Sequence, residues 1–464
     1  MLSTKIKAFL ASDGWTLRDN EARCGSRRIT FFSANRATAA LTKSLRGIAR
    51  HDGGRFRHIG VVVTTTTEQM NRLRVGKLPR AFFTSIAELE SPVTPSPSVT
   101  SFTAKIIANT PVGPTPSVHY RLVFDAPELG DILPPQFFMM DVLPARTPLG
   151  ERTVRRSDWQ AAVDWMPQPL LKRPFGLCRA YRPHFPVDYL KQLALPPALA
   201  AVLHPPAATR FDLLYKVLPE GVGTPLLTKL RRGDKVHMVG PLGRAFDVRE
   251  LREAGVEEVH IIGGGVGMAP LILLVEELRF HSFRVKVFLG MATLESLRYR
   301  DELAATFGEK PRDAYIYIDD LLAAGVAPTD IFLSGDREQP RQARRIPRKN
   351  LFHGLVPEQY RRFLSARQAS GKTMTFTCGP NRMMEVMTDI CQQAAVPLKV
   401  LLEKRMGCGF GVCFSCVQKV RRADGAADYV RVCKDGPIFD AKDIVWKNDY
   451  SKQPSANCGC AARS

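Results

Sequence analysis

Four cysteines near the carboxyl end of the chain have the spacing of metal or cluster ligands. Cys408, Cys413 and Cys416 follow the pattern C-x4-C-x2-C, and Cys433 comes after 16 further residues. The first three match the plant-type ferredoxin spacing, in which a tight loop surrounds an inorganic [2Fe-2S] core and a more distant thiolate completes it. We therefore predict a [2Fe-2S] cluster, a group that exchanges single electrons.

Glycines at 407, 409 and 411 support this prediction. A backbone that approaches sulfur closely adopts conformations that a side chain would hinder, and its N–H groups offset the negative charge of the cluster. The alternative is a structural zinc site with four cysteines, which usually has two C-x2–4-C knuckles. The second half of this pattern offers only Cys433, so the spacing favours the cluster. Cys458 and Cys460 lie in the tail and receive no role.

A second group of residues could bind a dinucleotide. Gly263, Gly264, Gly265 and Gly267 follow an apolar strand and precede a helix that begins near Ala269. This order offers a pyrophosphate close backbone approach and the free N–H groups of a helix N-terminus. The strict spacing G-x-G-x-x-G is absent, so a tight turn without a ligand is an equal alternative.

A second strand end could meet the same ligand. Cys378, Gly379 and Pro380 close a strand and lead into a helix, where the carboxyl edge of a parallel sheet binds ligands. Cys378 could lie beside a nicotinamide ring. A buried cysteine with no ligand explains that position equally well.

A third group could bind a flavin dinucleotide, which needs a cation for its pyrophosphate, an aromatic ring and hydrogen-bond donors at a helix start. The candidates, in chain order, are Arg173, Pro174, Phe175, Leu214, Tyr215, Lys216, Gly223 and Thr224. For each residue alone a structural role is the commoner explanation. Their order along the chain favours the flavin.

The elements that would hold these residues form successive segments. Short β-rich runs separated by Pro and Gly in 101–250 predict an antiparallel barrel, with a proline-rich insertion at 178–210. In 256–395, strand-like runs such as RVKVFLGMA alternate with helix-like runs such as LRYRDELAATF, which predicts a mostly parallel sheet with covering helices. Residues 396–446 carry the cysteines, and 447–464 form a tail.

The amino-terminal part looks like a separate unit. Residues 91–100, with the sequence SPVTPSPSVT, predict an extended linker. Residues 1–90 contain the strand-like runs RRITFFSA and HIGVVVTTTT, with the amphipathic run ATAALTKSLRGIAR between them. We therefore expect a multi-domain α/β plus β protein with a small basic α/β extension of unknown role.

The net charge of +21 is unevenly distributed. Residues 1–100 hold 16 basic and 7 acidic residues, and residues 337–349 hold 6 basic and 1 acidic. The charge therefore belongs to an extension and a loop rather than to the whole fold. The loop at 337–349 could hold the 2′-phosphate of NADP or could be a solvated loop, so the choice between NAD and NADP stays open.

No membrane span or secretion signal is predicted. The longest apolar stretch, 261–275, is shorter than the ~20 residues that a bilayer needs and contains four glycines. The first 15 residues have no apolar core followed by small cleavage residues. With cysteines in a ligand-like pattern, a cytoplasmic location is expected.

The chain from 102 to 446 resembles the electron-transfer subunit of B-type dihydroorotate dehydrogenases, within the ferredoxin-reductase superfamily. The matching segments are PPQFFMMDV, LLKRPFGL, LLYKV, GTPLLTKLRRGDKVHMVGPLGRAFD, IIGGGVGMAPL, FTCGPNRMM, LEKRMGCGFGVCFSCV and VCKDGPIFDAKDIVW. The resemblance implies a FAD-binding barrel, a NAD-binding domain and a [2Fe-2S] domain, in that order. It implies that Arg173, Pro174, Phe175, Gly176, Leu214, Tyr215, Lys216, Gly223 and Thr224 contact FAD and that the four cysteines bind iron.

The chain departs from the family pattern in several places. Gly176 stands where the family has serine, so a hydroxyl near the flavin ring is missing, and Lys216 replaces an arginine. The first 100 residues, the insertion at 178–210 and the loop at 337–349 have no counterpart in the family.

Together these residues predict an oxidoreductase that passes electrons between NAD(P)H, FAD, the cluster and an external partner. The order is fixed because nicotinamide exchanges hydride, the cluster exchanges single electrons and FAD can do both. The expected partner is a flavin-containing dihydroorotate dehydrogenase catalytic subunit of pyrimidine synthesis, in a hetero-oligomer. One alternative is a reductase subunit for a ferredoxin or a sulfur-reducing enzyme. Another is a redox sensor whose basic N-terminal module binds nucleic acid, although no recognised nucleic-acid motif accompanies the charge.

Overall fold

The computed structural model describes residues 11, 16–24, 27–33, 44–45, 48, 58–64, 81–85, 99–113, 119–126, 132–143, 172–181, 210–218, 220–293, 297–301, 310, 312–337, 346–366 and 372–446. Several predicted features lie wholly or largely outside this set. They are the linker up to residue 98, the insertion between 182 and 209, the basic loop between 338 and 345, and the tail with Cys458 and Cys460.

The amino-terminal unit contains a five-stranded sheet. Its strands, in spatial and chain order, are β1 (Thr16–Arg18), β2 (Glu21–Cys24), β3 (Arg27–Ser33), β4 (His58–Thr64) and β5 (Ala81–Ser85). β1 to β3 pair antiparallel, and β3 to β5 pair parallel. The two strands predicted here are therefore confirmed as β3 and β4. Of the helix predicted between them, Ser44, Leu45 and Ile48 are described, and all three are helical.

An antiparallel sheet of seven strands follows. It contains β6 (Thr100–Pro111), β7 (His119–Asp125), β8 (Phe137–Met140), β9 (Arg173–Gly176), β10 (Arg179–Tyr181), β11 (Arg210–Lys216) and β12 (Lys235–Leu242), in the order β10-β11-β7-β6-β12-β8-β9. Only Leu177 and Cys178 separate the two edge strands along the chain, so the sheet must curl until its edges come close. This arrangement confirms the predicted antiparallel half of the fold. The short helix α8 (Gly223–Leu227) lies between β11 and β12 along the chain.

The parallel sheet also has seven strands. They are β13 (Glu258–Gly264), β14 (Arg284–Met291), β17 (Ile331–Gly335), β18 (Leu351–His353), β19 (Thr373–Cys378), β20 (Leu398–Leu401) and β23 (Ile438–Asp440), in the order β18-β17-β14-β13-β19-β20-β23. All pairs are parallel except β20 with β23. β23 follows the cysteines in sequence, so the cysteine segment returns to extend this sheet.

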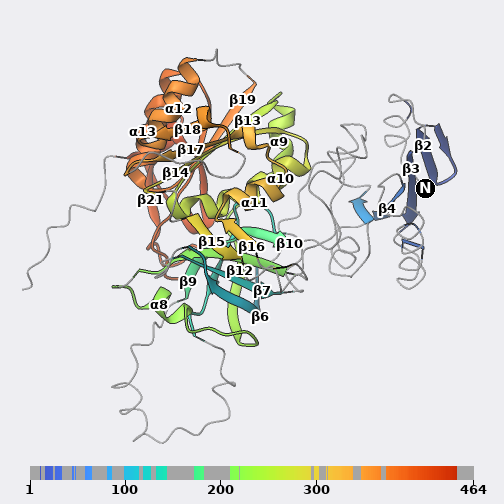
Figure 1. Ribbon diagram of the computed structural model, residues 1–464, viewed down its shortest axis with the longest axis horizontal. Coiled ribbons are helices and arrows are strands. Elements are labelled where there is room, and N and C mark those ends of the chain that lie inside the picture. Colours follow the sequence, from blue (N-terminus) through green and yellow to red (C-terminus); the bar gives the residue numbers. More distant parts are fainter. Residues whose placement is uncertain are drawn as a thin grey trace, which may run out of the picture.

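Helices cover both faces of the parallel sheet (Figure 1). They are α9 (Arg249–Glu253), α10 (Met268–Phe280), α11 (Ile318–Ala323), α12 (Val356–Ser365) and α13 (Asn381–Gln393). α10 packs on β13, β14 and β19, whereas α12 and α13 pack on β14, β17, β19 and β20. The predicted parallel sheet with covering helices is confirmed.

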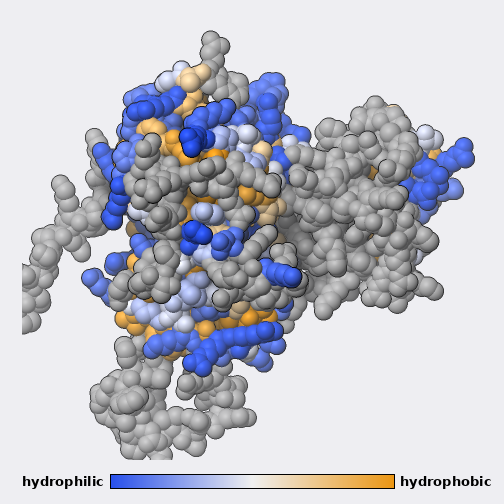
Figure 2. Space-filling model, viewed as in Figure 1, coloured by the Kyte–Doolittle hydropathy of each residue, from blue (hydrophilic) through white to orange (hydrophobic). Residues whose placement is uncertain are grey.

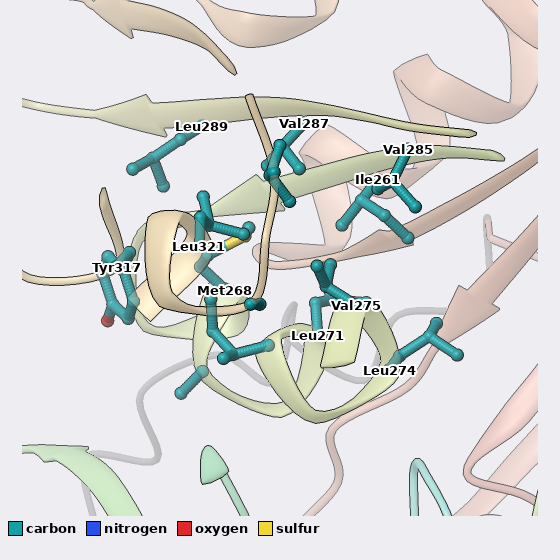
Figure 3. Packing of buried hydrophobic residues seen from close by; sticks show 14 of the residues in the cluster. Ile261, Met268, Leu271, Leu274, Val275, Val285, Val287, Leu289, Tyr317 and Leu321 are labelled. Atoms are coloured by element: carbon teal, nitrogen blue, oxygen red, sulfur yellow. The ribbon is translucent and has the colours of Figure 1, made fainter. Parts of the chain in front are cut away.

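The helix α10 is the central element of the core. Its sequence MAPLILLVEELRF is apolar on nearly every side, which is the pattern of a helix buried all round. Leu271 and Leu274 pack with Ile261 and Val285 of the parallel sheet, as Figure 3 shows. Leu273 belongs instead to the core of the antiparallel sheet. One helix therefore joins both cores.

One predicted helix is wrong where the structure describes it. The run LRYRDELAATF begins as a strand, β15 (Arg298–Asp301), which forms a hairpin with β16 (Arg312–Tyr315). Leu297 and Tyr299 are buried while Arg298 between them is exposed. That alternation has the period of a strand, and it outweighs the helical propensity of the residues that follow.

The cysteine segment is small and irregular. It contains the hairpin of β21 (Val417–Arg421) and β22 (Ala427–Arg431), followed by α14 (Val432–Asp435). Single 3-10 turns complete the structure: η2 (Gly265–Gly267), η5 (Pro328–Asp330), η6 (Arg348–Asn350) and η7 (Ala441–Asp443). Among the helices within the described ranges, none is long and apolar enough to cross a bilayer. Hydrophilic side chains cover much of the visible surface, with apolar side chains between them (Figure 2).

Candidate redox site

The four predicted ligand cysteines form two neighbouring pairs. Cys408 and Cys413 lie in the loop of residues 402–416, called the cysteine loop below, and their thiol groups interact with each other. Cys416 ends this loop, and its thiol interacts with that of Cys433 on α14. Backbone N–H groups donate to the sulfurs: Val412 to Cys408 and Cys433 to Cys416, both at 3.4 Å. Two pairs of thiols with N–H donors suit two bridged irons, each held by two cysteines.

The zinc alternative is weakened by the spacing of the cysteines. Structural zinc sites usually have two C-x2–4-C knuckles, and here Cys433 stands alone in the second half.

The surroundings of the thiols set their pKa values. The hydroxyl of Ser415, 3.1 Å from the Cys413 sulfur, and nearby backbone N–H groups lower the pKa of Cys413 to about 6. Burial raises the pKa of Cys408, but backbone N–H groups outweigh it, so the net pKa is lowered. Burial, with the neighbouring Cys416, raises the pKa of Cys433 to about 12. One pair is therefore surface-facing and readily ionised, and the other contains a buried thiol that needs a cation to ionise.

Two glycines let the cysteine loop pack closely against its neighbours. Gly409 and Gly411 have φ of +86° and +87°. A Cβ at Gly409 would collide with the side chain of Met139 on β8, and one at Gly411 would lie 2.8 Å from the Lys434 side chain. Met139 pairs with Pro174 of β9. The cysteine loop therefore lies against the strand pair that carries the first predicted flavin residues.

The predicted flavin residues come together from distant parts of the chain. A Cβ at Gly223 would lie 3.1 Å from Nε of Arg173, so the arginine side chain passes directly over the start of α8. The Phe175 ring meets the Tyr215 ring edge-on, with centroids 6.3 Å apart. Thr224 is already engaged, because its hydroxyl accepts a hydrogen bond from the Leu218 N–H at 2.9 Å.

Exposure separates these residues into two groups. Arg173, Pro174, Phe175 and Gly176 are half-buried, and Lys216 is exposed, so a ligand can reach them. Leu214 and Tyr215 are buried. The Tyr215 hydroxyl donates to Asn109 Oδ1 at 3.1 Å, and burial raises the pKa of this phenol. The predicted contacts of Leu214 and Tyr215 with FAD stay a prediction.

The predicted nucleotide residues meet at one edge of the parallel sheet. Gly263 pairs with Cys378, so the turn at 263–267 and the turn at 378–380 lie side by side. A Cβ at Gly267 would lie 2.7 Å from the backbone of Cys378, and one at Gly379 would lie 3.1 Å from Gly264. Gly265 has φ of +57° and open space around it. The glycines therefore bring two backbones together and leave N–H groups near the start of α10.

The flavin and nucleotide residues also touch each other. A Cβ at Gly176 would lie 3.1 Å from Cβ of Pro270, in the first turn of α10. The glycine that departs from the family's serine is thus packed against the helix that follows the nucleotide turn.

Glu403 joins the nucleotide turn to the cysteine loop, and the sequence reasoning missed it. Its carboxyl oxygen Oε1 lies 3.9 Å from the sulfur of Cys378. Burial raises the pKa of Glu403 and that of Cys378. The position of an acidic residue directly after the apolar run LKVLL was the available signal.

The cysteine loop carries large apolar side chains on its surface. Phe410, Val412 and Phe414 are 53%, 70% and 61% exposed, and Tyr429 of the adjoining hairpin is 55% exposed. The Arg431 guanidinium lies over the Phe414 ring, 5.4 Å from its centroid. An apolar surface next to exposed cluster ligands is typical of a contact site for another protein.

Comparison with known proteins identifies relatives of this chain. Residues 403–445 match the model of the iron-sulfur cluster binding domain of dihydroorotate dehydrogenase B, and this range contains all four cysteines. The chain is 29% identical over 346 residues to the dihydroorotate dehydrogenase B (NAD(+)) electron transfer subunit of Desulforamulus reducens, covering 75% of this chain and 98% of that protein. It is 30% identical over 277 residues to the same subunit of Geobacillus thermodenitrificans, covering 60% and 81%. Among solved structures, an NADH-dependent reduced ferredoxin-NADP oxidoreductase matches with a TM-score of 0.45 and 18% identity over 74% of this chain and 89% of that one.

Proposed function

The chain belongs to the family of dihydroorotate dehydrogenase B electron transfer subunits, and we propose that it transfers electrons between NAD and a dihydroorotate dehydrogenase catalytic subunit. The transfer uses FAD and a [2Fe-2S] cluster, and the two subunits form a hetero-oligomer of pyrimidine synthesis. The observation that carries this proposal is the contiguity of three sites. The cysteine loop packs on Met139, Met139 pairs with Pro174, and Gly176 touches Pro270 of the nucleotide helix.

The residues present fit the three groups. Cys408, Cys413, Cys416 and Cys433 would hold the cluster, with backbone N–H groups donating to their sulfurs. Arg173 would neutralise the flavin pyrophosphate above the start of α8, next to the ring of Phe175. Gly263, Gly264, Gly265 and Gly267, with Cys378, Gly379 and Pro380, would receive the nicotinamide dinucleotide.

A bound flavin supplies the exchange between a two-electron hydride and the single electrons that a [2Fe-2S] cluster accepts. The chain's own residues would position the bound groups relative to one another. Gly176 leaves room for α10 to approach β9. Burial raises the pKa of the Glu403 carboxyl and that of the Cys378 thiol, which favours the protonated form of each group.

The nicotinamide cofactor in this proposal is NAD rather than NADP. The names of the relatives specify NAD(+). The rates of hydride transfer from NADH and NADPH would separate the two cofactors, and we expect NADH to be faster. If NADH and NADPH gave comparable rates, the basic loop at 337–349 would again be a candidate site for the 2′-phosphate of NADP.

The proposed location is the cytoplasm. Within the described residues the cysteines are free thiols, and cluster ligands must stay reduced until iron binds.

The test is co-expression of the chain with a dihydroorotate dehydrogenase catalytic subunit. We expect the purified complex to contain iron, acid-labile sulfide and FAD, and to reduce NAD+ when dihydroorotate is added. Cys416→Ser should abolish the sulfide and the coupled reaction, whereas Cys391→Ser, at a buried cysteine on α13, should leave both intact.

Two outcomes would count against this function. A colourless protein without iron or flavin would contradict the cofactors. A complex that contains both groups but shows no dihydroorotate-coupled NAD+ reduction would contradict the partner. Co-purification of the chain with a ferredoxin or a sulfur-reducing enzyme would then support the alternative function.

A further inference from the structure

A buried group of charges connects the antiparallel sheet to the helices of the parallel sheet. Arg121 of β7 donates two hydrogen bonds to Asp320 of α11, at 2.9 and 2.5 Å. Arg179 of β10 donates to Glu276 of α10 at 2.8 Å. Arg121, Glu276 and Asp320 are 5%, 6% and 3% exposed. In each pair the arginine comes from the antiparallel sheet and the carboxylate from a helix that packs on the parallel sheet.

The two ion pairs act on the segments that carry the predicted cofactor residues. Arg179 lies three residues after Gly176, on the strand that follows β9. Glu276 lies on α10, the helix that begins directly after the glycine turn and whose Pro270 touches Gly176. Any loosening of these pairs would change how the flavin strands face the start of α10.

Stability alone does not account for this group. Buried ion pairs often contribute no more to stability than apolar side chains of the same volume, because desolvation offsets their attraction. Asp212 of β11 also belongs to this group, with Oδ2 3.4 Å from Arg121 Nη1. Arg121 Nε and Asp212 Oδ1 are buried without a hydrogen-bond partner among the described residues. Burial raises the pKa of Asp320, but Arg121 outweighs it, so the net pKa is lowered and the carboxylate stays charged.

The backbone around Asp320 is also held in an unusual conformation. Tyr317, fully buried before α11, has φ of +64° and ψ of −44°, which a residue with a side chain rarely adopts. Its N–H donates to Asp320 Oδ2 at 3.2 Å. Such strain persists where the surrounding structure fixes a specific geometry.

We propose that the pairs Arg121–Asp320 and Arg179–Glu276 form an interdomain clamp that sets the approach of the nicotinamide to the flavin. These four are positioning residues, and the inference rests on the function proposed above. A clamp of this kind fixes orientation through directional hydrogen bonds, two of them between Arg121 and Asp320, which apolar packing cannot provide.

The clamp predicts a specific kinetic defect. A misplacement of about 1 Å lowers a reaction rate by up to roughly 100-fold, because the reacting atoms leave their near-attack geometry. NADH binding depends on the glycine turn and not on the clamp. Loosening the clamp should therefore slow flavin reduction at saturating NADH and leave the NADH dissociation constant unchanged.

The experiment uses the full chain with Asp320→Asn, followed by stopped-flow reduction of the flavin by NADH. We expect the limiting rate to fall by about 10- to 100-fold, with an NADH dissociation constant within about twofold of wild type and unchanged iron and flavin content. In the apoprotein, amides of α11 and β10 should exchange with deuterium faster than in wild type. Asp125→Asn is the matched control, because Asp125 pairs with Arg210 across β7 and β11 within one sheet.

A second variant covers the case in which Asp320→Asn does not fold. The triple change Arg121→Met, Asp212→Asn and Asp320→Leu replaces the Arg121–Asp320 pair by apolar side chains and leaves no buried carboxylate without its cation, because Asp212 Oδ2 lies 3.4 Å from Arg121 Nη1. A stable triple variant with a slowed limiting rate would support the clamp, and one with the wild-type rate would overturn it. If wild type itself is not reduced by NADH, the proposed function fails instead. Equal effects of Asp320→Asn and Asp125→Asn on the limiting rate would also overturn the clamp.

Discussion

At the scale of single residues, the cluster cysteines differ in exposure and in thiol pKa, although the sequence pattern assigns all four the same role as ligands. Cys413 lies on the surface beside the Ser415 hydroxyl, and Cys433 is buried on α14. The pKa of Cys413 falls to about 6, whereas the pKa of Cys433 rises to about 12. The exposed thiol therefore ionises first, and this order is testable before any iron is present.

In the cluster-free chain, we predict that iodoacetamide labels Cys413 with a half-maximal rate near pH 6. The thiolate is the reactive form, so a pKa below the usual value of about 8.5 moves labelling to lower pH. Cys391 is the internal control, because burial raises its pKa to about 12. Peptide mass spectrometry across a pH series measures both sites. Labelling of Cys413 only above pH 8 would contradict the assigned surroundings.

The sequence located these residues more completely than it located their neighbours. Four cysteines with ferredoxin spacing and three glycines are visible in one short window. Met139, which requires Gly409 to have no side chain, comes from a strand about 270 residues earlier in the chain. Glu403 was missed because its partner Cys378 lies on another element. Contacts between distant segments leave no pattern in a single sequence.

At the scale of elements, apolar runs of suitable length predicted the strands and helices that are buried in the core. β13, α10 and β14 follow their apolar patterns, and Figure 3 shows the resulting packing of Leu271 and Val275 against Ile261. β15 was predicted as helix, because the alternation of Leu297, Arg298 and Tyr299 is too short to reveal a period of two. The pairing of β23 with β20 could not be predicted either, because 36 residues separate the two strands.

A close contact between two backbone segments gives the next prediction. Gly267→Ala should weaken NADH binding by about tenfold or more, because a Cβ there would lie 2.7 Å from the backbone of Cys378. Such overpacking costs about 1–3 kcal/mol of folding free energy, and here it separates the two turns that would hold the dinucleotide. Titration of NADH followed by flavin absorbance measures the effect.

Gly255→Ala controls for a general loss of stability. Gly255 has φ of +74°, so a side chain strains the backbone, but nothing lies within 4 Å of a Cβ at this position. We expect a lower melting temperature with normal NADH binding. If both variants bind NADH equally well, the contact between the glycine turn and Cys378 does not shape the nucleotide site.

At the scale of the whole molecule, the three sites lie in one line of contact. The nucleotide turn starts α10, Pro270 of α10 touches Gly176, and Met139 beside Pro174 supports the cysteine loop. In the proposed function, this order would connect hydride exchange at the nucleotide turn, the flavin, and single-electron exchange with the partner at the cysteine loop. The cysteine loop lies at the molecular surface, where Cys408 and Cys413 are reachable and Phe410, Val412 and Phe414 are exposed.

We predict that Val412→Gln weakens coupling to the catalytic subunit without affecting the internal steps. Val412 is the most exposed of these apolar side chains, and glutamine removes apolar contact area without adding a charge beside the cluster. The apparent KM for the catalytic subunit in dihydroorotate-dependent NAD+ reduction should rise by about fivefold or more, as for a substituted contact residue worth at least about 1 kcal/mol. Reduction of the flavin and the cluster by NADH should proceed at the wild-type rate. Leu355→Gln is the matched control, since Leu355 is 61% exposed but precedes α12 on the nucleotide side. If Leu355→Gln raises the KM as much as Val412→Gln does, the catalytic subunit does not dock on the cysteine loop, and electrons pass between the two subunits elsewhere.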